Sequence, residues 1–479
     1  MKKLVYDIIN KLKKEDITFG DVRFTSTDNQ TIYFEKGVLR HFGADLDSLA
    51  IGVRVLVDGC WGFAGTTIFS NSEIESTIKK AITNAKVGAK FRKEPAAYKK
   101  LAPVVTSYFY QPEEDPFLMD DQEKINFHEN IAKKLVGNEK IIYSYVYSEF
   151  YRQYKVYANT DGTFVDTLVY DSLPTMYVLA SNGKETMCRT WPGHMNGRRG
   201  GFEAVRAAKM EENTDKIIEE AIQLLDAPRI TEEKADLIIG SGHLALQLHE
   251  SVGHATEADR IFGKEISYAG KTFIKPAMLG NFKYGSDIVN IYSDSMDEKG
   301  MGFHVVDDEG TPGCREDIIK DGILLSQQTS QENAPLLGLN PSSNMLATHA
   351  NDIPLIRMTN FCLAPGKGSL AELIKSTEKG YYIDFTKTWS IDDNRNNFQF
   401  TTEIGWKIEN GEITGIVKEP TYYGITPEFW ANCDAICGPE EWGYQGTFHC
   451  GKGEPGQAMH LSHGVAPARF KDIVCNVKA

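Results

Sequence analysis

The residues best suited to chemistry form a short cluster in the middle of the chain, at residues 249–254 (HESVGH). Two histidines, His249 and His254, lie on either side of a carboxylate, Glu250. Imidazole nitrogens are common ligands of divalent metal ions, and a carboxylate beside them can act as a general base on a water molecule. These residue types point to metal-assisted hydrolysis.

The spacing of the two histidines requires a distorted helix. In the familiar His-Glu-x-x-His helix the histidines are four residues apart and share one face. Here they are five apart, which on a regular helix of ~3.6 residues per turn leaves the rings about 140° apart. One wide turn with i to i+5 hydrogen bonds would bring both rings toward one face, and Gly253 lowers the steric cost of such a turn. Without that turn, the cluster is an ordinary part of a half-buried helix.

A third metal ligand must come from elsewhere, because a catalytic metal site usually takes three protein ligands and leaves one position for water. Glu257 and Asp259 are candidates on the same segment. A distant candidate is the stretch 446–457 (GTFHCGKGEPGQ), where His449 and Cys450 are adjacent. Neighbouring side chains of a strand point to opposite faces, so only one of these two can easily face the metal. Spacing alone leaves the third ligand open.

The overall composition is that of a globular protein that does not attract polyanions. The chain has 479 residues, of which 41% are hydrophobic and 25% charged, and its formal net charge is −14. This charge repels phosphate backbones and anionic lipid, so we expect no nucleic-acid partner. No stretch approaches the ~20 apolar residues of a membrane span, and the amino terminus lacks the apolar region of a signal peptide. We expect a cytoplasmic protein with no membrane partner.

The first half of the chain is expected to mix strands and helices. Residues 95–116 are rich in proline, tyrosine and charge and indicate a connector. Asp161-Gly162 is the pair best suited to a tight hairpin turn. Alternating patterns predict strands at 21–35, 48–67 and 140–180, and helical spacing predicts helices at 1–16, 72–91, 120–135 and 203–225.

A domain boundary is expected near Pro228, because a proline cannot extend the helix predicted over residues 203–225. This divides the chain into an N-terminal domain, residues 1–227, and a C-terminal domain, residues 228–479. A strand at 235–239 leads into the histidine cluster, and many short strand patterns follow to the end of the chain. The expected fold class is therefore α+β, with a β-rich second half.

Two polar features of the second half have less specific roles. The acidic stretch 307–312 (DDEGTP) could line a cleft, but its glycine and proline favour a solvated turn. Arg357 could bind a peptide carboxylate or form a structural ion pair.

Several motifs taken together resemble the TldD/PmbA family of metallopeptidases, and this resemblance spans almost the whole chain. The likeness is to the catalytic TldD type, because both histidines, the glutamate and the late cysteine are present, whereas the PmbA (TldE) type lacks the metal site. The stretch 384–394 (DFTKTWSIDDN) departs from the family pattern in lacking a glycine-rich loop. The matching motifs are IGVRVLVDGCWGFA (51–64), HESVGHATEAD (249–259), DDEGTPG (307–313), IIKDGIL (318–324), RMTN (357–360) and HCGKGEPGQ (449–457).

The resemblance implies a site and a fold. It assigns the metal to His249, His254 and Cys450 and the general-base role to Glu250. It implies an N-terminal α/β-type domain with mixed strands and helices, and a C-terminal barrel-like metallopeptidase domain that carries the metal-site helix. It also implies dimerisation, as a homodimer or as a heterodimer with a TldE/PmbA-type subunit. A thiolate with two imidazoles suits zinc among the divalent metals.

We therefore expect a metal-dependent peptidase that hydrolyses peptides or unfolded protein segments, with Glu250 moving the proton of the attacking water. The alternative is a non-catalytic regulatory binding protein with a structural or vacant metal site, because some members of this family have been labelled modulators of DNA gyrase.

Overall fold

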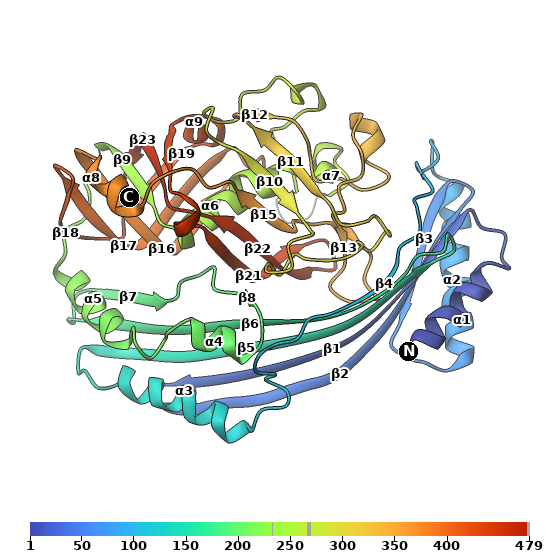
Figure 1. Cartoon of the computed structure of the whole chain (residues 1–479), viewed down its shortest axis with the longest axis horizontal. Helices are drawn as coiled ribbons and strands as arrows, with labels where there is room; N and C mark the ends of the chain where they lie inside the picture. Colours follow the sequence, from blue (N-terminus) through green and yellow to red (C-terminus); the bar gives the residue numbers. More distant parts are fainter. Residues whose placement is uncertain (232, 266–269, 477–479) are drawn as a thin grey trace.

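The computed structural model describes residues 1–231, 233–265 and 270–476. Figure 1 shows two layers: a long arched sheet formed by the first part of the chain, and a second half, rich in short strands, that lies over one face of this sheet. Helices and strands occur in both layers. The α+β fold class expected from the sequence is confirmed.

The N-terminal sheet is built from long antiparallel strands. Its order is β3-β2-β1-β5-β6-β4, with β7 and β8 also paired to β6, and β4 is parallel to β6. Gly162, at the turn between β5 and β6, has φ +111°, as the expected hairpin requires. The strands are β1 (Phe19–Glu35), β2 (Val38–Val57), β3 (Cys60–Thr66), β4 (Val105–Phe109), β5 (Ile141–Asn159), β6 (Phe164–Ser181), β7 (Thr186–Trp191) and β8 (Arg198–Arg199).

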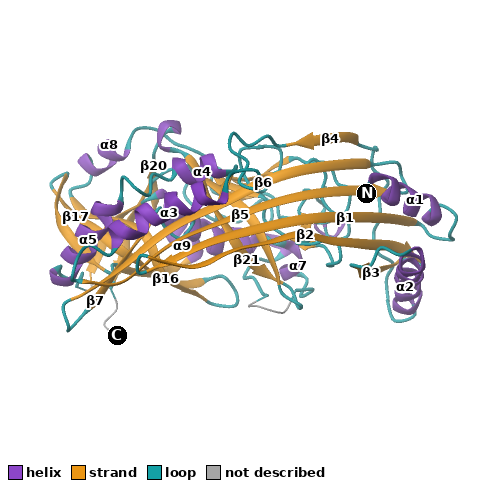
Figure 2. Ribbon diagram, turned by 90° about the horizontal axis from the view of Figure 1, so that it is seen from below, coloured by secondary structure: helices purple, strands orange, loops and turns teal. Residues whose placement is uncertain are grey.

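The N-terminal helices pack at the two ends of this sheet, as Figures 1 and 2 show. Their apolar faces form two separate cores, one beneath α1 and α2 and one beneath α3 to α5. In the part of the chain that the structure describes, no helix is both long and apolar enough to cross a bilayer. These helices are α1 (Lys2–Leu12), α2 (Asn71–Ala89), α3 (Asp121–Leu135), α4 (Phe202–Ala207) and α5 (Thr214–Asp226).

The single helix expected over residues 203–225 is wrong, because two helices, α4 and α5, occupy this segment. Lys209 has φ +50°, a left-handed conformation that ends the first helix. The break lets Met210 enter the core, where it is fully buried. Asn213 and Thr214 then start the second helix, and such short polar residues favour helix ends over helix interiors. Periodicity alone does not detect a break of this kind.

The segment 95–116 is also more than the expected connector, because it contains β4. This strand lies at the edge of the sheet and pairs only with β6. Its side chains build no core, and Val105 and Phe109 are exposed. An edge strand without a buried face leaves no alternating pattern in the sequence.

The C-terminal half contains a closed five-stranded barrel, which confirms the barrel-like domain implied by the resemblance. The ring runs β16-β9-β23-β19-β17 and closes through the pairing of β16 with β17, while β18 and β20 extend it. The strands are β9 (Glu233–Ile239), β16 (Lys379–Ile391), β17 (Asn397–Glu409), β18 (Glu412–Lys418), β19 (Thr421–Ile425), β20 (Cys433–Ile436) and β23 (Ala468–Cys475), accompanied by α8 (Leu370–Lys375) and α9 (Thr426–Ala431).

A second C-terminal sheet has the order β12-β11-β10-β15-β22-β21. Helix α6 (Ser241–Leu248) follows the barrel strand β9 and contacts both β16 and the β21–β22 hairpin. The histidine cluster, which follows the end of α6, therefore lies close to that hairpin. The strands are β10 (Ile291–Asp294), β11 (Arg315–Lys320), β12 (Ile323–Leu324), β15 (Asn360–Leu363), β21 (Gly443–Lys452) and β22 (Gln457–Val465), with a small hairpin of β13 (Met345–Leu346) and β14 (Leu355–Ile356).

The acidic stretch 307–312 is not the expected solvated turn, because it is buried between the two layers. Asp308 and Glu309 are 1% and 3% exposed. Lys155 of β5 donates to Asp308 Oδ1 at 2.9 Å, and Arg54 of β2 donates to Glu309 Oε1 at 3.0 Å. These cations lie far away in the sequence, so the local composition could not reveal them. The stretch ties the second half of the chain to the arched sheet.

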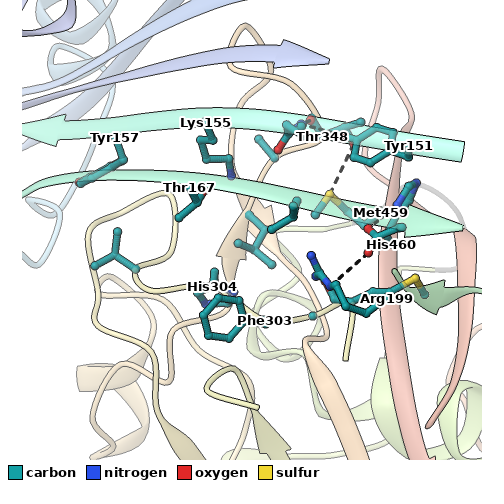
Figure 3. A pocket seen from close by; sticks show the side chains of 18 of the residues that line it. Tyr151, Lys155, Tyr157, Thr167, Arg199, Phe303, His304, Thr348, Met459 and His460 are labelled. Atoms are coloured by element: carbon teal, nitrogen blue, oxygen red, sulfur yellow. Dashed lines mark hydrogen bonds and ion pairs between the residues drawn. The ribbon is translucent and has the colours of Figure 1, made fainter. Parts of the chain in front are cut away.

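A pocket between the two layers, shown in Figure 3, contains a second connection. Asp171 of β6 lies 3.0 Å from Nδ1 of His460 on β22 and 3.2 Å from Nε of Arg199. The His460 ring also contacts Tyr151 of β5, with 4.4 Å between ring centroids. The contacts of His460 with Asp171 and Tyr151 hold β22 against the N-terminal sheet. The division into residues 1–227 and 228–479 stays a prediction.

Candidate metal centre

The two histidines are positioned by a change of helix type. Helix α6 continues into a π-helical turn, η1 (His249–Gly253), and then into a 3₁₀ turn, η2 (His254–Thr256). The backbone N–H of His254 donates to the carbonyl oxygen of His249, which is the i to i+5 bond of a wide turn. The wide turn that the spacing requires is thus confirmed. It brings the two imidazole rings to 4.6 Å between centroids.

Gly253 is required by packing rather than by backbone conformation. Its φ of −54° is open to any residue. A Cβ atom at this position would lie 2.1 Å from Sδ of Met358, a residue that is itself buried. The missing side chain lets the π turn lie directly against the segment that leads into β15.

The structure brings His249, His254 and Cys450 together. One ligand atom from each lies within 4.8 Å of the others, and all three side chains are buried. The Cys450 Sγ atom is 3.8 Å from His254 Nε2. Tetrahedral zinc would hold a nitrogen and a sulfur about 3.6 Å apart. Across residues 1–231, 233–265 and 270–476 this is the one such group of histidine, cysteine and acidic side chains, and its donor set fits a divalent metal.

The tautomer of His249 follows from a chain of hydrogen bonds. The Phe361 carbonyl oxygen, 2.8 Å from Nδ1 of His463, can only accept, so His463 carries its proton on Nδ1. The other nitrogen of His463, Nε2, then accepts from Nδ1 of His249 at 2.8 Å. The Nε2 lone pair of His249 is left free for a metal. Burial lowers the pKa of His249 to about 4, which favours the neutral ring that metal binding needs.

His254 is oriented in the same way by Glu257. A carboxylate oxygen of Glu257 lies 3.2 Å from Nδ1 of His254, so this nitrogen donates and Nε2 faces Cys450. Arg260 donates to the same carboxylate at 2.5 Å, and Lys452 lies 3.2 Å from it. Glu257 is fully buried, and these two cations hold its pKa well below the usual range despite the opposing effect of burial.

The other candidates for a third ligand lie outside the cluster. Asp259 pairs with Lys452 at 2.8 Å and is not part of the ligand group. His449 is exposed, whereas the adjacent Cys450 is 3% exposed. This difference follows the alternation of side chains along β21.

Glu250 is held by two side chains that the sequence did not single out. Trp389 donates its indole N–H to Oε1 at 3.1 Å, and the Arg395 guanidinium pairs with Oε2. Burial by itself would raise the pKa of Glu250, but His254, His249, Arg395 and the Trp389 hydrogen bond together outweigh burial and lower this pKa. The carboxylate is therefore ionised and fixed in orientation.

Cys450 is positioned by Arg357, which donates to the Cys450 carbonyl oxygen and, at 3.2 Å, to that of Gln457. Arg357 is completely buried, and its bonds to β21 and β22 give it a structural role in holding this hairpin. Burial raises the pKa of the Cys450 thiol, but the guanidinium of Arg357 and the His254 imidazole more than offset this effect. The resulting lowered pKa favours the thiolate, which is the metal-binding form.

Sequence reasoning missed His463, Trp389 and Arg395. Trp389 lies in the segment 384–394, whose departure from the family pattern was the one available signal. His463 lies in β22 without a recognisable spacing to any other histidine. Its role depends on the pairing of β22 with β21, which places it behind the π turn.

The family models that match this chain place it in the metallopeptidase class, which comprises hydrolases that act on peptide bonds. Models of the PmbA/TldA metallopeptidase domain 1, central domain and C-terminal domain match residues 20–85, 114–227 and 232–462. The chain belongs to the PmbA/TldD family.

Individual relatives match along most of their length. A metalloprotease of Methanocaldococcus jannaschii is 25% identical, and the match covers 93% of this chain and 94% of the relative. A zinc metalloprotease TldD homolog of Saccharolobus solfataricus is 26% identical, with 98% and 99% covered. Among solved structures, a candidate modulator of DNA gyrase from Thermotoga maritima has a TM-score of 0.77 at 18% identity and covers 99% of this chain and 100% of its own. TldE from Thermococcus kodakarensis has a TM-score of 0.72 at 15% identity, with the same coverage. The two structures share the fold.

Proposed function

We propose that this protein is a zinc-dependent peptidase that cleaves peptides or unfolded protein segments. The proposed metal ligands are His249, His254 and Cys450, and the proposed general base is Glu250. The observation that carries the proposal is the convergence of two imidazoles and one thiol, with Glu250, whose pKa is lowered, next to the ligand His249 in the chain. Two imidazoles and a thiolate favour zinc, and the Saccharolobus solfataricus relative is named a zinc enzyme.

A bound divalent cation would activate a water molecule and polarise the scissile carbonyl group. Glu250 would accept the proton of that water and return it to the leaving amine. Trp389 and Arg395 each use one lone pair of a carboxylate oxygen, so a lone pair remains on each oxygen for the proton. The carboxylate can thus act without losing the contacts that orient it.

The substrate would lie in a cleft between the arched sheet and the second half of the chain. Its walls include Tyr33, Tyr147 and Tyr177 on the sheet side, and Thr388 and His449 on the other. Thr388 and His449 each lie next to a residue of the candidate centre, Trp389 and Cys450. The candidate ligands are buried, so a flexible or unfolded segment would reach them more easily than the surface of a folded protein.

A second subunit belongs to the same proposal. Family membership and the similarity in fold to TldE support either a homodimer or a heterodimer with a TldE/PmbA-type subunit.

The test is peptide digestion by the wild type and Glu250→Gln, with zinc content measured on the same samples. We expect turnover to fall at least about 100-fold in the variant, the range for loss of a general base, while zinc is retained. Glu129→Gln is the matched control, because Glu129 also follows a histidine on a helix but is partly exposed and pairs with Lys133. Unchanged turnover in Glu250→Gln with zinc retained would contradict the general-base role. It would favour the alternative of a regulatory binding protein with a structural metal.

A further inference from the structure

We propose that His194 is a further catalytic residue of this site, whose imidazole N–H donates a hydrogen bond to the scissile carbonyl oxygen as negative charge develops on it. The inference rests on the proposed peptidase function. His194 lies on the loop between β7 and β8, in the N-terminal half of the chain and far in sequence from the HESVGH motif.

The loop that carries His194 is fixed to the strand that carries Cys450. The backbone N–H of Gly197 donates to the carbonyl oxygen of Gly446 at 2.8 Å, and the N–H of Gly446 donates to that of Met195 at 3.3 Å. Asn196 and Gly446 thereby form a parallel bridge between the loop and β21. These bonds hold the residues directly after His194, and before it β7 ends at Trp191, which is paired with Met176 of β6. The loop is thus anchored at both ends by the fold, as the support of a group that acts on a transition state must be.

His194 lies beside the proposed general base. Its ring is 4.8 Å from the ring of Trp389, centroid to centroid, and Trp389 donates to Glu250 Oε1. The cleft of the proposed substrate site is lined by both His194 and His449. The ring contact with Trp389 and the shared cleft thus place this imidazole beside residues that adjoin the candidate metal centre.

The His194 side chain is available for a ligand. It is exposed to the cleft, and among the described residues it makes no side-chain hydrogen bond. The buried histidines differ in this respect: both ring nitrogens of His243, for example, bond to Thr386 and Tyr422. Enclosure in the cleft, with the nearby imidazoles of His249 and His449, lowers the pKa of His194, so the neutral ring carries one N–H and one lone pair.

The chemistry asked of His194 is a hydrogen bond without proton transfer. When water adds to the peptide carbonyl, negative charge moves onto the carbonyl oxygen. An N–H aimed at that oxygen stabilises the charged state more than the neutral substrate, and such a bond raises kcat more than it lowers KM. Glu250 accounts for the proton from water, so His194 begins and ends the cycle in the same protonation state.

The experiment compares the purified wild type with His194→Ala, His194→Gln and Glu250→Gln in one peptide-cleavage assay. Zinc content and the inhibition constant of a phosphinic peptide, which mimics the tetrahedral state, are measured for each. We expect His194→Ala to lower kcat about 100-fold, the effect of losing one such donor, with KM within threefold and zinc unchanged. The inhibition constant should rise in proportion to the fall in kcat/KM. His194→Gln, which keeps an N–H donor, should recover part of the loss.

His41→Ala is the matched control, because His41 is an exposed histidine on β2. It should keep the wild-type kcat. A kcat within threefold of the wild type in His194→Ala, a change in KM alone, or loss of zinc would overturn the role of His194. If Glu250→Gln is inactive while the His194 variants are active, only this inference fails. If the wild type does not cleave peptides, the proposed function itself fails.

Discussion

His463 lies behind His249 rather than beside the candidate metal position: its Nε2 atom is 2.8 Å from Nδ1 of His249. His463 is in turn held by the Phe361 carbonyl oxygen, so one backbone atom of β15 determines which nitrogen of His249 is free. Such indirect contacts orient metal ligands and are important to affinity.

The first prediction concerns this contact. His463→Phe removes the acceptor for Nδ1 of His249 but keeps an aromatic ring in the same buried place. We expect zinc affinity, measured by competition with a chelator, to fall 10–100-fold, the usual effect of losing such a partner. An affinity equal to that of the wild type would show that His463 does not orient His249.

Cys450 and His449 are neighbours on β21 and provide a matched pair for the third ligand. Cys450→Ala should lose stoichiometric zinc, because its buried Sγ atom lies beside His254 Nε2. His449→Ala should keep zinc, because its ring is exposed in the cleft. Elemental analysis of both proteins, purified without chelator, provides the comparison. Retention in Cys450→Ala together with loss in His449→Ala would reverse the assignment.

Asp171 is expected to stabilise the contact between the two layers. Its carboxylate is 2% exposed and pairs with Arg199 and His460. Asp171→Ala would leave the buried Arg199 guanidinium without a counter-charge, which typically costs about 3–5 kcal/mol. Urea unfolding at pH 7 measures the effect. Asp7→Ala, at an exposed position of α1, should change stability by less than about 0.5 kcal/mol. Equal stabilities of the two variants would contradict this role.

His128 should make stability depend on pH. Its Nδ1 donates to the Lys124 carbonyl oxygen at 2.7 Å, so its buried Nε2 accepts from Ser148 and has no place for a second proton. Burial lowers its pKa from 6.5 to about 4. Between these two pH values the unfolded chain therefore binds more protons than the folded chain. The contribution of His128 to the unfolding free energy is complete above pH 6.5 and is lost as the pH falls toward 4. The full effect is about 3 kcal/mol.

The corresponding measurement is a series of urea unfolding curves between pH 7 and pH 4.5. His128→Gln should flatten the pH dependence of the unfolding free energy without abolishing it, because His243 and His304 are also buried with lowered pKa values. A pH dependence identical to that of the wild type would show that His128 does not contribute.

Local rules predicted those features of the site that are local in the chain. The five-residue spacing of His249 and His254 leaves a wide turn as the way to bring both rings to one face, and the structure contains this turn. Cys450 could not be identified in this way, because spacing left Glu257, Asp259 and His449 open as alternative candidates for the third ligand. Only the resemblance to a family singled it out.

The remaining parts of the site depend on contacts between distant segments. Trp389 and Arg395 meet Glu250 only because β16 closes the barrel beside α6. The local composition predicts a solvated turn for Asp308 and Glu309. It cannot show that Lys155 and Arg54, which are distant in the sequence, pair with these carboxylates from the other layer. The break between α4 and α5 likewise depends on a core position for Met210. Short-range patterns do not encode these packing relationships.

Joint metal binding by His249, His254 and Cys450 is tested most directly by anomalous diffraction at the zinc edge, from crystals of the protein grown with added zinc. We expect one strong peak about 2.0–2.1 Å from each histidine Nε2 atom and about 2.3 Å from the Cys450 Sγ atom. Crystals without a peak at this position, or with zinc held by other residues, would contradict the proposed metal centre.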